Sequence, residues 1–202
     1  MPLAPNAIAE AQSAMSPTEG ALRTYIHGDP CPDNLVVDSA RRIRLVDFEV
    51  GGYANALIDA VYLRMPFPTC WCCGTTPPAL TTAFERRYRD RLSDFVAEAS
   101  SDTLFDTALV DACAAWALRL LGRRINALLD HEPERDPDPW RGFPGPTPRE
   151  QALVWLDAFV HVAADRDRRP ALADAVGRCA EALAERWHTS PPIPFFPAFS
   201  QD

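Results

Sequence analysis

Residues 25–38, "YIHGDPCPDNLVVD", set the local architecture of the first quarter of this chain. The two prolines and the glycine within 27–34 exclude a helix or a central strand, so this segment is predicted to be a loop. Two short apolar runs rich in valine and isoleucine follow at 34–38 and 42–48, and they predict a β-hairpin. The expected order is therefore loop, strand, turn, strand and a second loop.

The two loops that flank this hairpin carry a set of polar side chains. Asn34 precedes the first strand and Asp47 ends the second, so the two side chains are expected to lie close in space. An amide oxygen and a carboxylate form an all-oxygen site that suits Mg²⁺. Asp29 projects from the same loop as Asn34, where it can orient or deprotonate an acceptor hydroxyl. The spacing His-x-Asp-x-x-x-x-Asn followed by Asp-Phe-x is that of a kinase catalytic loop and metal loop.

These segments resemble the catalytic segment of the aminoglycoside phosphotransferase and choline kinase superfamily, over residues 22–65. The resemblance implies that Asp29 is the catalytic aspartate. It also implies that His27 belongs to the catalytic residues and supports the conformation of the loop. It implies that Asn34 and Asp47 bind Mg²⁺. The implied reaction transfers the γ-phosphate of ATP to a hydroxyl group of a small molecule.

The same resemblance implies two supporting residues. Asp59, after the metal loop, would be a structural aspartate that supports the catalytic loop, and Glu49 would lie near the metal or the substrate. The chain departs from the family pattern at Cys31, beside the loop prolines. It departs again after "DFE", where "VGGYANALID" replaces the usual Gly-Asp-Pro.

The segment before the catalytic loop is short. Only 26 residues precede His27, and they contain neither a Gly-rich loop nor a lysine. The N-terminal, nucleotide-covering lobe of a kinase-like fold does not fit there. We therefore expect the C-terminal lobe alone, inactive or weakly active as an isolated chain. It would be a truncated product, the result of a mis-assigned start, or a subunit whose missing lobe another chain supplies.

The remainder of the chain is predicted to be helical, so the expected fold class is α+β and predominantly helical, with the hairpin carrying both loops. Apolar residues recur at helical spacing. The stripes expected to be buried are Leu57, Ile58, Val61 and Met65; Leu80, Phe84, Tyr88, Leu92 and Val96; and Phe105, Leu109, Cys113, Trp116 and Leu120. Thr147 and Glu150 form a capping box. The helices are expected at 54–65, at 102–130, at 147–160 and at 170–187. A further helix is expected to begin at "TTPP" (75–78), with an N-cap threonine and proline in its first turn, and to extend to 96. The expected organisation is a flexible or weakly helical lead-in (1–20), a phosphotransferase lobe (21–188) with the loops at 26–52, a helical part at 54–188 and a Pro-rich insert at 132–148, and a Pro/aromatic tail (189–202).

Composition restricts the partners. The net charge of −8 argues against nucleic acid and favours a cationic ligand. No apolar run is long enough to span a membrane, and no signal peptide is recognisable. Cytoplasmic location and reduced thiols are therefore the preferred interpretation of the six cysteines. The cluster at 70–73 is expected to be buried thiols, since its spacing does not match a zinc site.

Three alternatives remain open at this stage. The acidic insert at 132–148 is a solvated loop, the interpretation that we favour, or a surface that attracts a cationic substrate. The chain is an enzyme, or it is a non-catalytic remnant that binds a ligand or partner. The tail segment "PPIPFFPAF" is a further candidate, as a docking strip for another protein.

Overall fold

The chain is described from a computed structural model, which defines residues 3–15, 22–70, 74–131, 146–189 and 193–199. Helices predominate, and the strands form two small sheets. The α+β, predominantly helical class is therefore observed, whereas assignment to the C-terminal lobe of a kinase-like fold stays a prediction. The elements are α1 (Pro5–Ala14), β1 (Arg23–Ile26), η1 (Pro32–Asn34), β2 (Leu35–Val37), β3 (Ile43–Leu45), β4 (Gly52–Asn55), α2 (Leu57–Ala60), α3 (Pro78–Ser93), η2 (Ala97–Ser100), α4 (Asp102–Arg123), α5 (Ile125–Asp130), α6 (Pro148–Asp165), α7 (Pro170–Trp187) and η3 (Pro197–Phe199).

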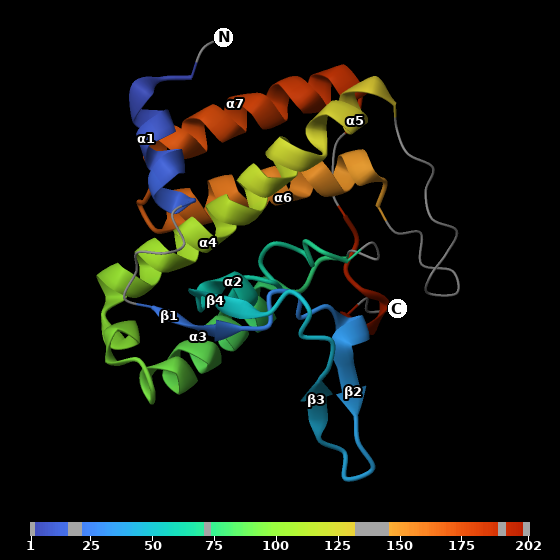
Figure 1. Cartoon of the computed structure of the whole chain (residues 1–202). Coiled ribbons are helices and arrows are strands. Elements are labelled where there is room, and N and C mark those ends of the chain that lie inside the picture. The colour runs from blue at the N-terminus through green and yellow to red at the C-terminus, as the bar shows by residue number, and fades with distance from the viewer. Residues whose placement is uncertain (1–2, 16–21, 71–73, 132–145, 190–192, 200–202) are drawn as a thin grey trace.

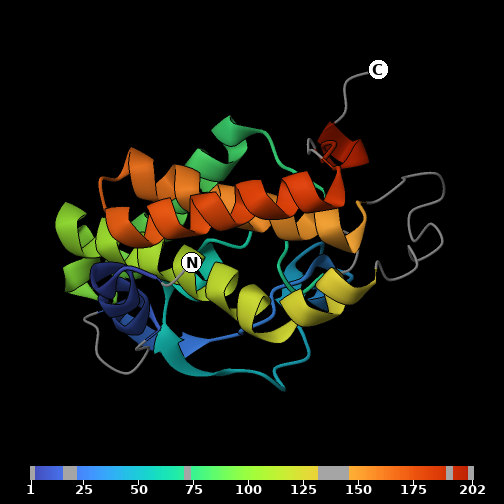
Figure 2. The same ribbon diagram turned by 90° about the horizontal axis from the view of Figure 1, so that it is seen from above.

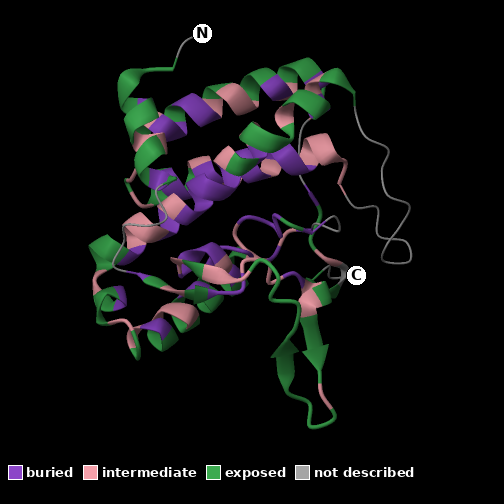
Figure 3. Ribbon diagram, in the orientation of Figure 1, coloured by how far each residue is buried: buried purple, intermediate pink, exposed green. Residues whose placement is uncertain are grey.

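Helices α1, α4, α6 and α7 form the larger part of the molecule (Figure 1). Helix α6 packs against both α4 and α7, and α1 contacts α4 and α7. The facing sides of these helices are buried (Figure 3), with Leu109 and Cys113 on α4 and Phe159 on α6 fully enclosed. The hydrophobic core therefore lies between the helices, and the strands lie at its edge.

The N-terminal segment forms a regular helix, α1, instead of the weakly helical lead-in that we expect from its composition. In the view from above, α1 lies beside the N-terminal end of α7 (Figure 2). There the Glu10 carboxylate accepts a hydrogen bond of 2.7 Å from the backbone N–H of Leu172. An unpaired N–H in the first turn of α7 is satisfied in this way, and tertiary packing stabilises a helix whose own propensity is modest.

The β-hairpin predicted at 34–48 is confirmed as β2 and β3, which pair antiparallel with Leu35 opposite Leu45. Its apolar side chains are exposed, and it projects from the body (Figure 3). A second antiparallel pair joins β1 to β4, with Ile26 opposite Gly52. The catalytic and metal loops thus leave and re-enter the body next to one another.

The helix predicted at 54–65 is wrong in extent. Residues up to Asn55 belong to β4, and the helical segment α2 covers only Leu57–Ala60. Prolines at 66 and 68 disfavour further helix, since a proline removes a backbone donor and restricts the residue before it. The predicted apolar set is nevertheless buried: Leu57, Ile58, Val61 and Met65.

Two further helix predictions need correction. The segment predicted as one helix at 102–130 is divided at Arg124 into α4 and α5. On α3 the predicted stripe is displaced, because Leu80 and Phe84 are exposed whereas Glu85 is buried. Glu85 is buried with a partner, since its two oxygens accept hydrogen bonds of 2.5 and 2.7 Å from Arg64. The buried face of α3 therefore includes a bidentate ion pair, which the pattern of apolar residues does not predict.

The prediction of reduced thiols is wrong for two of the cysteines. Cys31 of the catalytic loop forms a disulfide with Cys70, and their Cα atoms are 6.0 Å apart. Cys113 and Cys179 are free, and burial raises the pKa of both thiols. The other two cysteines of the 70–73 cluster lie outside the described residues.

The capping box at the start of α6 is confirmed: Thr147 Oγ1 accepts from the N–H of Glu150, whose carboxylate accepts from the N–H of Thr147. Of the Pro-rich insert, residues 132–145 lie outside the described part of the chain. The described tail packs back on the body, because Thr75 bridges to Phe195 and Ile193 is buried. This packing does not favour a freely presented docking strip. No helix in the described part combines the length and the apolar character that crossing a bilayer requires.

Candidate active site

The catalytic loop is attached to α2 through the side chain of Asp59. One carboxylate oxygen accepts a hydrogen bond of 2.7 Å from the N–H of His27, and the other accepts one of 2.9 Å from the N–H of Gly28. Gly28 has φ +81°, and a Cβ at this position would lie 2.8 Å from the carbonyl oxygen of Val50. The sharp turn therefore requires glycine, and Asp59 pairs the two amides that the turn leaves without backbone partners.

Burial raises the pKa of Asp59, and this outweighs the hydrogen bonds from His27 and Gly28, which lower it. A carboxyl group with a raised pKa contributes most to folding below its unfolded pKa, and that contribution is lost as the pH rises through the folded pKa. We therefore expect the free energy of unfolding of the natural chain to fall, relative to that of Asp59→Asn, as the pH rises above about 3.9, the ordinary pKa of aspartate. Urea unfolding of both chains across this range measures the free energy of unfolding of the natural chain minus that of the variant. If this value rises with pH, the assignment is wrong.

His27 supports the loop from inside. Its ring is buried, and Nε2 lies 2.8 Å from the carbonyl oxygen of Val46. Nδ1 accepts a hydrogen bond of 3.3 Å from the N–H of Asp29. A carbonyl oxygen accepts only from a protonated nitrogen, so the proton lies on Nε2 and the ring joins the catalytic loop to the end of β3. The ring also packs on Phe48, with centroids 4.4 Å apart.

The carboxylate of Asp29 is held by side chains from three segments. Oδ1 accepts from the hydroxyl groups of Tyr62, at 3.1 Å, and Thr69. Oδ2 lies 3.3 Å from Nδ2 of Asn34. Burial raises the pKa of Tyr62, and the Asp29 charge acts in the same direction, so the phenol remains a donor to this carboxylate. Asp29 is thus oriented before any ligand binds.

The side chain of Asn34 has a defined orientation. Its Nδ2 donates a hydrogen bond of 2.9 Å to the carbonyl oxygen of Asp29. A carbonyl oxygen cannot donate, so the bonded atom must be the nitrogen, and Oδ1 remains available as an acceptor. The backbone carbonyl of Asn34 accepts from the N–H of Val46, at 3.0 Å, which places Asp47 next to the start of β2. The predicted proximity of the two loops is therefore present.

Asp47 has an unusual backbone and an exposed side chain. Its φ is +63°, in the left-handed region that residues other than glycine rarely adopt. The carboxylate makes no hydrogen bond or ion pair with any described residue. Glu49 is also exposed. A strained backbone that presents an unpaired carboxylate is the kind of conformation found at functional sites.

The donor set of these loops fits Mg²⁺. Oδ1 of Asn34 and the carboxylate of Asp47 are hard oxygen ligands, and Mg²⁺ commonly uses one or two protein ligands, with water and phosphate oxygens completing the octahedron. No cluster of three or more His, Cys, Asp or Glu side chains suited to a metal occurs among the described residues. A site of this kind would therefore depend on a bound phosphate.

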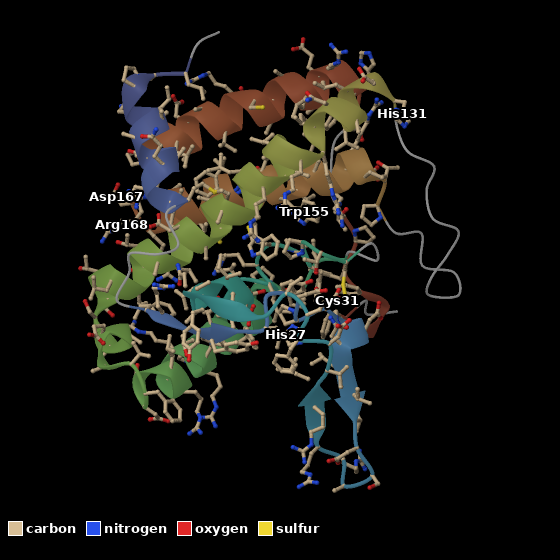
Figure 4. All side chains as sticks on the ribbon, in the orientation of Figure 1. His27, Cys31, His131, Trp155, Asp167 and Arg168 are labelled. Atoms are coloured by element: carbon tan, nitrogen blue, oxygen red, sulfur yellow. A yellow bond between two sulfur atoms is a disulfide. The ribbon has the colours of Figure 1, made fainter. Side chains whose placement is uncertain are left out.

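A cavity of about 850 Å³ opens beside the catalytic loop. Gly28, Asp29 and Thr69 line one part of it, and the indole rings of Trp116 and Trp155 line another. Hydrogen bonds of 3.2 Å hold the indole nitrogens against backbone carbonyl groups. Figure 4 shows Trp155 between the helices and the segment that carries His27 and Cys31. Asp29 therefore faces a space large enough for a small molecule.

Several parts of the site have no local signal in the sequence. Tyr62 lies in a segment that periodicity assigns to a helix, and Thr69 lies in a segment without a pattern, yet both donate to Asp29. Cys31 and Cys70 are separated by 39 positions in the sequence. The sulfur–sulfur bond at Cys31 is visible in Figure 4. It joins the catalytic loop to the residue after Thr69.

A loop held by the half-buried Asp59, a carboxylate facing a cavity and a second carboxylate across a hairpin make up the arrangement that the sequence predicts for phosphotransfer. A family model described as the phosphotransferase enzyme family matches residues 5–99. This segment contains both loops, the hairpin and Asp59, and the resemblance to the aminoglycoside phosphotransferase and choline kinase superfamily is thereby confirmed. No match was found among the curated proteins.

Proposed function

We propose that this chain takes part in the transfer of the γ-phosphate of ATP to a hydroxyl group of a small molecule, with Mg²⁺. The observation that carries the proposal is the position of Asp29. Its carboxylate lines the cavity, and its loop also holds Asn34, which is next to the strand that ends before Asp47. Acceptor and metal-bound phosphate would thus meet at one carboxylate.

Each residue has a role in this proposal. Asp29 accepts a hydrogen bond from the acceptor hydroxyl and takes its proton as the oxygen–phosphorus bond forms. The bond between the γ-phosphorus and the bridging oxygen breaks, and ADP leaves. Asn34 and Asp47 would hold Mg²⁺, which neutralises charge on the phosphates when bound. His27 and Asp59 position the loop, and Glu49, two residues after Asp47, would lie near the metal or the substrate.

The metal side of the site is open. Asp47, Phe48 and Glu49 are exposed, so the described residues would contact bound phosphates from one side only. Slow turnover is therefore expected from the isolated chain, and a second chain that covers this face would raise the rate. Binding of nucleotide is for this reason the more direct test than turnover.

Asp47→Asn is expected to remove the Mg²⁺ dependence of ATP binding. In the natural chain, Mg²⁺ should raise the affinity for ATP by about 10-fold, because the Asp47 carboxylate would bind the ion that the phosphates also bind. An amide at this position binds the ion more weakly than a carboxylate does, so the increase should be lost in the variant. Calorimetric titration with ATP, with and without Mg²⁺, measures the difference. Asp90→Asn removes an exposed carboxylate of α3 and serves as the control. Equal Mg²⁺ dependence in both variants would refute the metal assignment, and binding without transfer to any acceptor would indicate a non-catalytic ligand-binding module.

A further inference from the structure

The cavity beside Asp29 is lined by more basic than acidic side chains. Its acidic lining residues are Asp29 and Asp111, and Asp111 forms an ion pair with Arg169 at 2.7 Å. The basic lining residues are Arg23, Arg119, Arg123, Arg124 and Arg169. The chain as a whole has a net charge of −8, so this local excess of positive charge is opposite in sign to the average surface.

Three of these arginines lie together at the C-terminal end of α4. The side chains of Arg119, Arg123 and Arg124 form no ion pair or hydrogen bond with any residue that the structure describes. By contrast, Arg64, Arg166 and Arg169 each pair with a carboxylate. The helix dipole stabilises cations near a helix C-terminus, which explains why unpaired arginines are tolerated at the end of α4. That effect does not explain why they also line the cavity.

Arg119 is the best-positioned member of this group. Its guanidinium lies over the ring of Trp116, 5.3 Å from the centroid, so it is held over the cavity wall. Partial burial and the neighbouring charge of Arg123 both lower its pKa. An anion bound between Arg119 and Arg123 would remove this repulsion. The two residues are four apart on α4 and therefore lie on the same face.

A short chain of contacts connects this group with Asp29. The ring of Trp116 packs edge-on against Tyr62, with centroids 6.4 Å apart. The hydroxyl of Tyr62 donates to the carboxylate of Asp29. Asn34 and Asp47 do not line the cavity, whereas Asp29 does. Arg119 therefore lies on the acceptor side of Asp29 and not on the side of the proposed metal.

The net charge of the chain does not decide what binds here. Charges more than about 8 Å apart across solvent are largely screened at physiological ionic strength. The charge of the ligand that the cavity prefers is consequently set by the lining arginines rather than by the carboxylates of the distant surface. The cationic acceptor predicted from overall charge rests on that surface and on the insert at 132–148, mostly outside the described residues. The cavity lining favours the opposite sign.

We propose that the acceptor is an anionic hydroxyl compound, whose carboxylate or phosphate group binds Arg119 and Arg123 while its hydroxyl group reaches Asp29. This inference rests on the proposed function, since it takes Asp29 as the site of transfer. Arginine presents a planar set of donors that matches both anions. Trp116 and Ile58 supply an apolar wall between the two polar ends.

The test is a calorimetric titration without ATP or Mg²⁺. The probes are glycerol 3-phosphate and gluconate as anions, glycerol as the neutral analogue and choline as the cation. We expect the anions to bind most tightly, and to lose about 10-fold or more in affinity in the double variant Arg119→Gln/Arg123→Gln. The matched control is Arg86→Gln/Arg87→Gln, which makes the same change in net charge on exposed positions of α3. It should bind as the natural chain does.

Three results would overturn the proposal: neither anion binds, the double variant binds them as the control does, or choline or glycerol binds more tightly. A parallel titration with ATP and Mg²⁺ distinguishes the source of the anion. If the double variant loses affinity for ATP but not for the anionic probes, the arginines bind the donor and the proposal is wrong. Loss of Mg²⁺-dependent ATP binding in Asp47→Asn is measured separately. The proposed function is therefore tested independently of the anionic acceptor.

Discussion

Replacement of Asp29 by asparagine is expected to lower the rate of phosphotransfer by about 10²-fold or more, with little change in the fold. Asparagine keeps an oxygen that can accept from Tyr62 and Thr69, so the side chain retains its main contacts. It cannot take the proton of the acceptor hydroxyl, because an amide is not a base at neutral pH. Initial rates of phosphate transfer, under conditions in which the natural chain turns over, measure the loss.

Asp33→Asn is the matched control for this variant. Asp33 is in the same loop, is exposed, and its side chain makes no hydrogen bond or ion pair with a described residue. Circular dichroism and thermal unfolding should be unchanged in both variants, so that a loss of rate cannot be attributed to unfolding. If Asp29→Asn transfers phosphate as fast as Asp33→Asn, Asp29 is not the catalytic group and the mechanism is wrong.

The double variant Cys31→Ser/Cys70→Ser is expected to lower the free energy of unfolding by about 4 kcal/mol. A disulfide restricts the unfolded chain, and the bond between these residues closes a loop with a sequence separation of 39. The loop-entropy relation gives about 4 kcal/mol for a loop of this length. The expected loss is a large part of the roughly 5–15 kcal/mol that stabilises most domains. Urea unfolding under non-reducing conditions measures it.

Reduction supplies an independent test of the same bond. Dithiothreitol should destabilise the natural chain to a similar degree and should leave the double variant almost unchanged. Cys179→Ser, at a free and half-buried cysteine, is the control for loss of a thiol. Peptide mapping without reductant should identify the linked pair. If the natural chain unfolds at the same urea concentration with and without reductant, the bond is absent in solution.

Local sequence patterns predict the parts of this fold that depend on near neighbours. The hairpin follows from two β-branched runs and a polar turn, and the loop before it follows from its prolines and glycine. The buried face of α4 agrees with prediction from Phe105 to Leu120, because it needs only the period of the helix. The proximity of Asn34 and Asp47 also follows from local spacing, because the two residues flank the same hairpin.

The remaining parts depend on long-range contacts that local patterns do not contain. The clamp between His27 and Asp59 spans 32 positions, and the contact between Asp29 and Thr69 spans 40. The pairing of β1 with β4 likewise joins distant residues, with Arg23 opposite Asn55 and Ile26 opposite Gly52. The charge of the cavity arises from residues that, on a helical pattern, are simply exposed arginines. Tertiary structure alone brings them to the site.

The left-handed backbone at Asp47 has a consequence for how this position tolerates change. Glycine adopts φ +63° without steric conflict, whereas most other residues are strained there. Glycine would therefore relax the backbone but would remove the exposed carboxylate. Stability and activity favour different residues at this position, as they often do at functional sites. Selection for thermal stability alone would therefore favour glycine at position 47, and the carboxylate proposed to bind the metal would be lost.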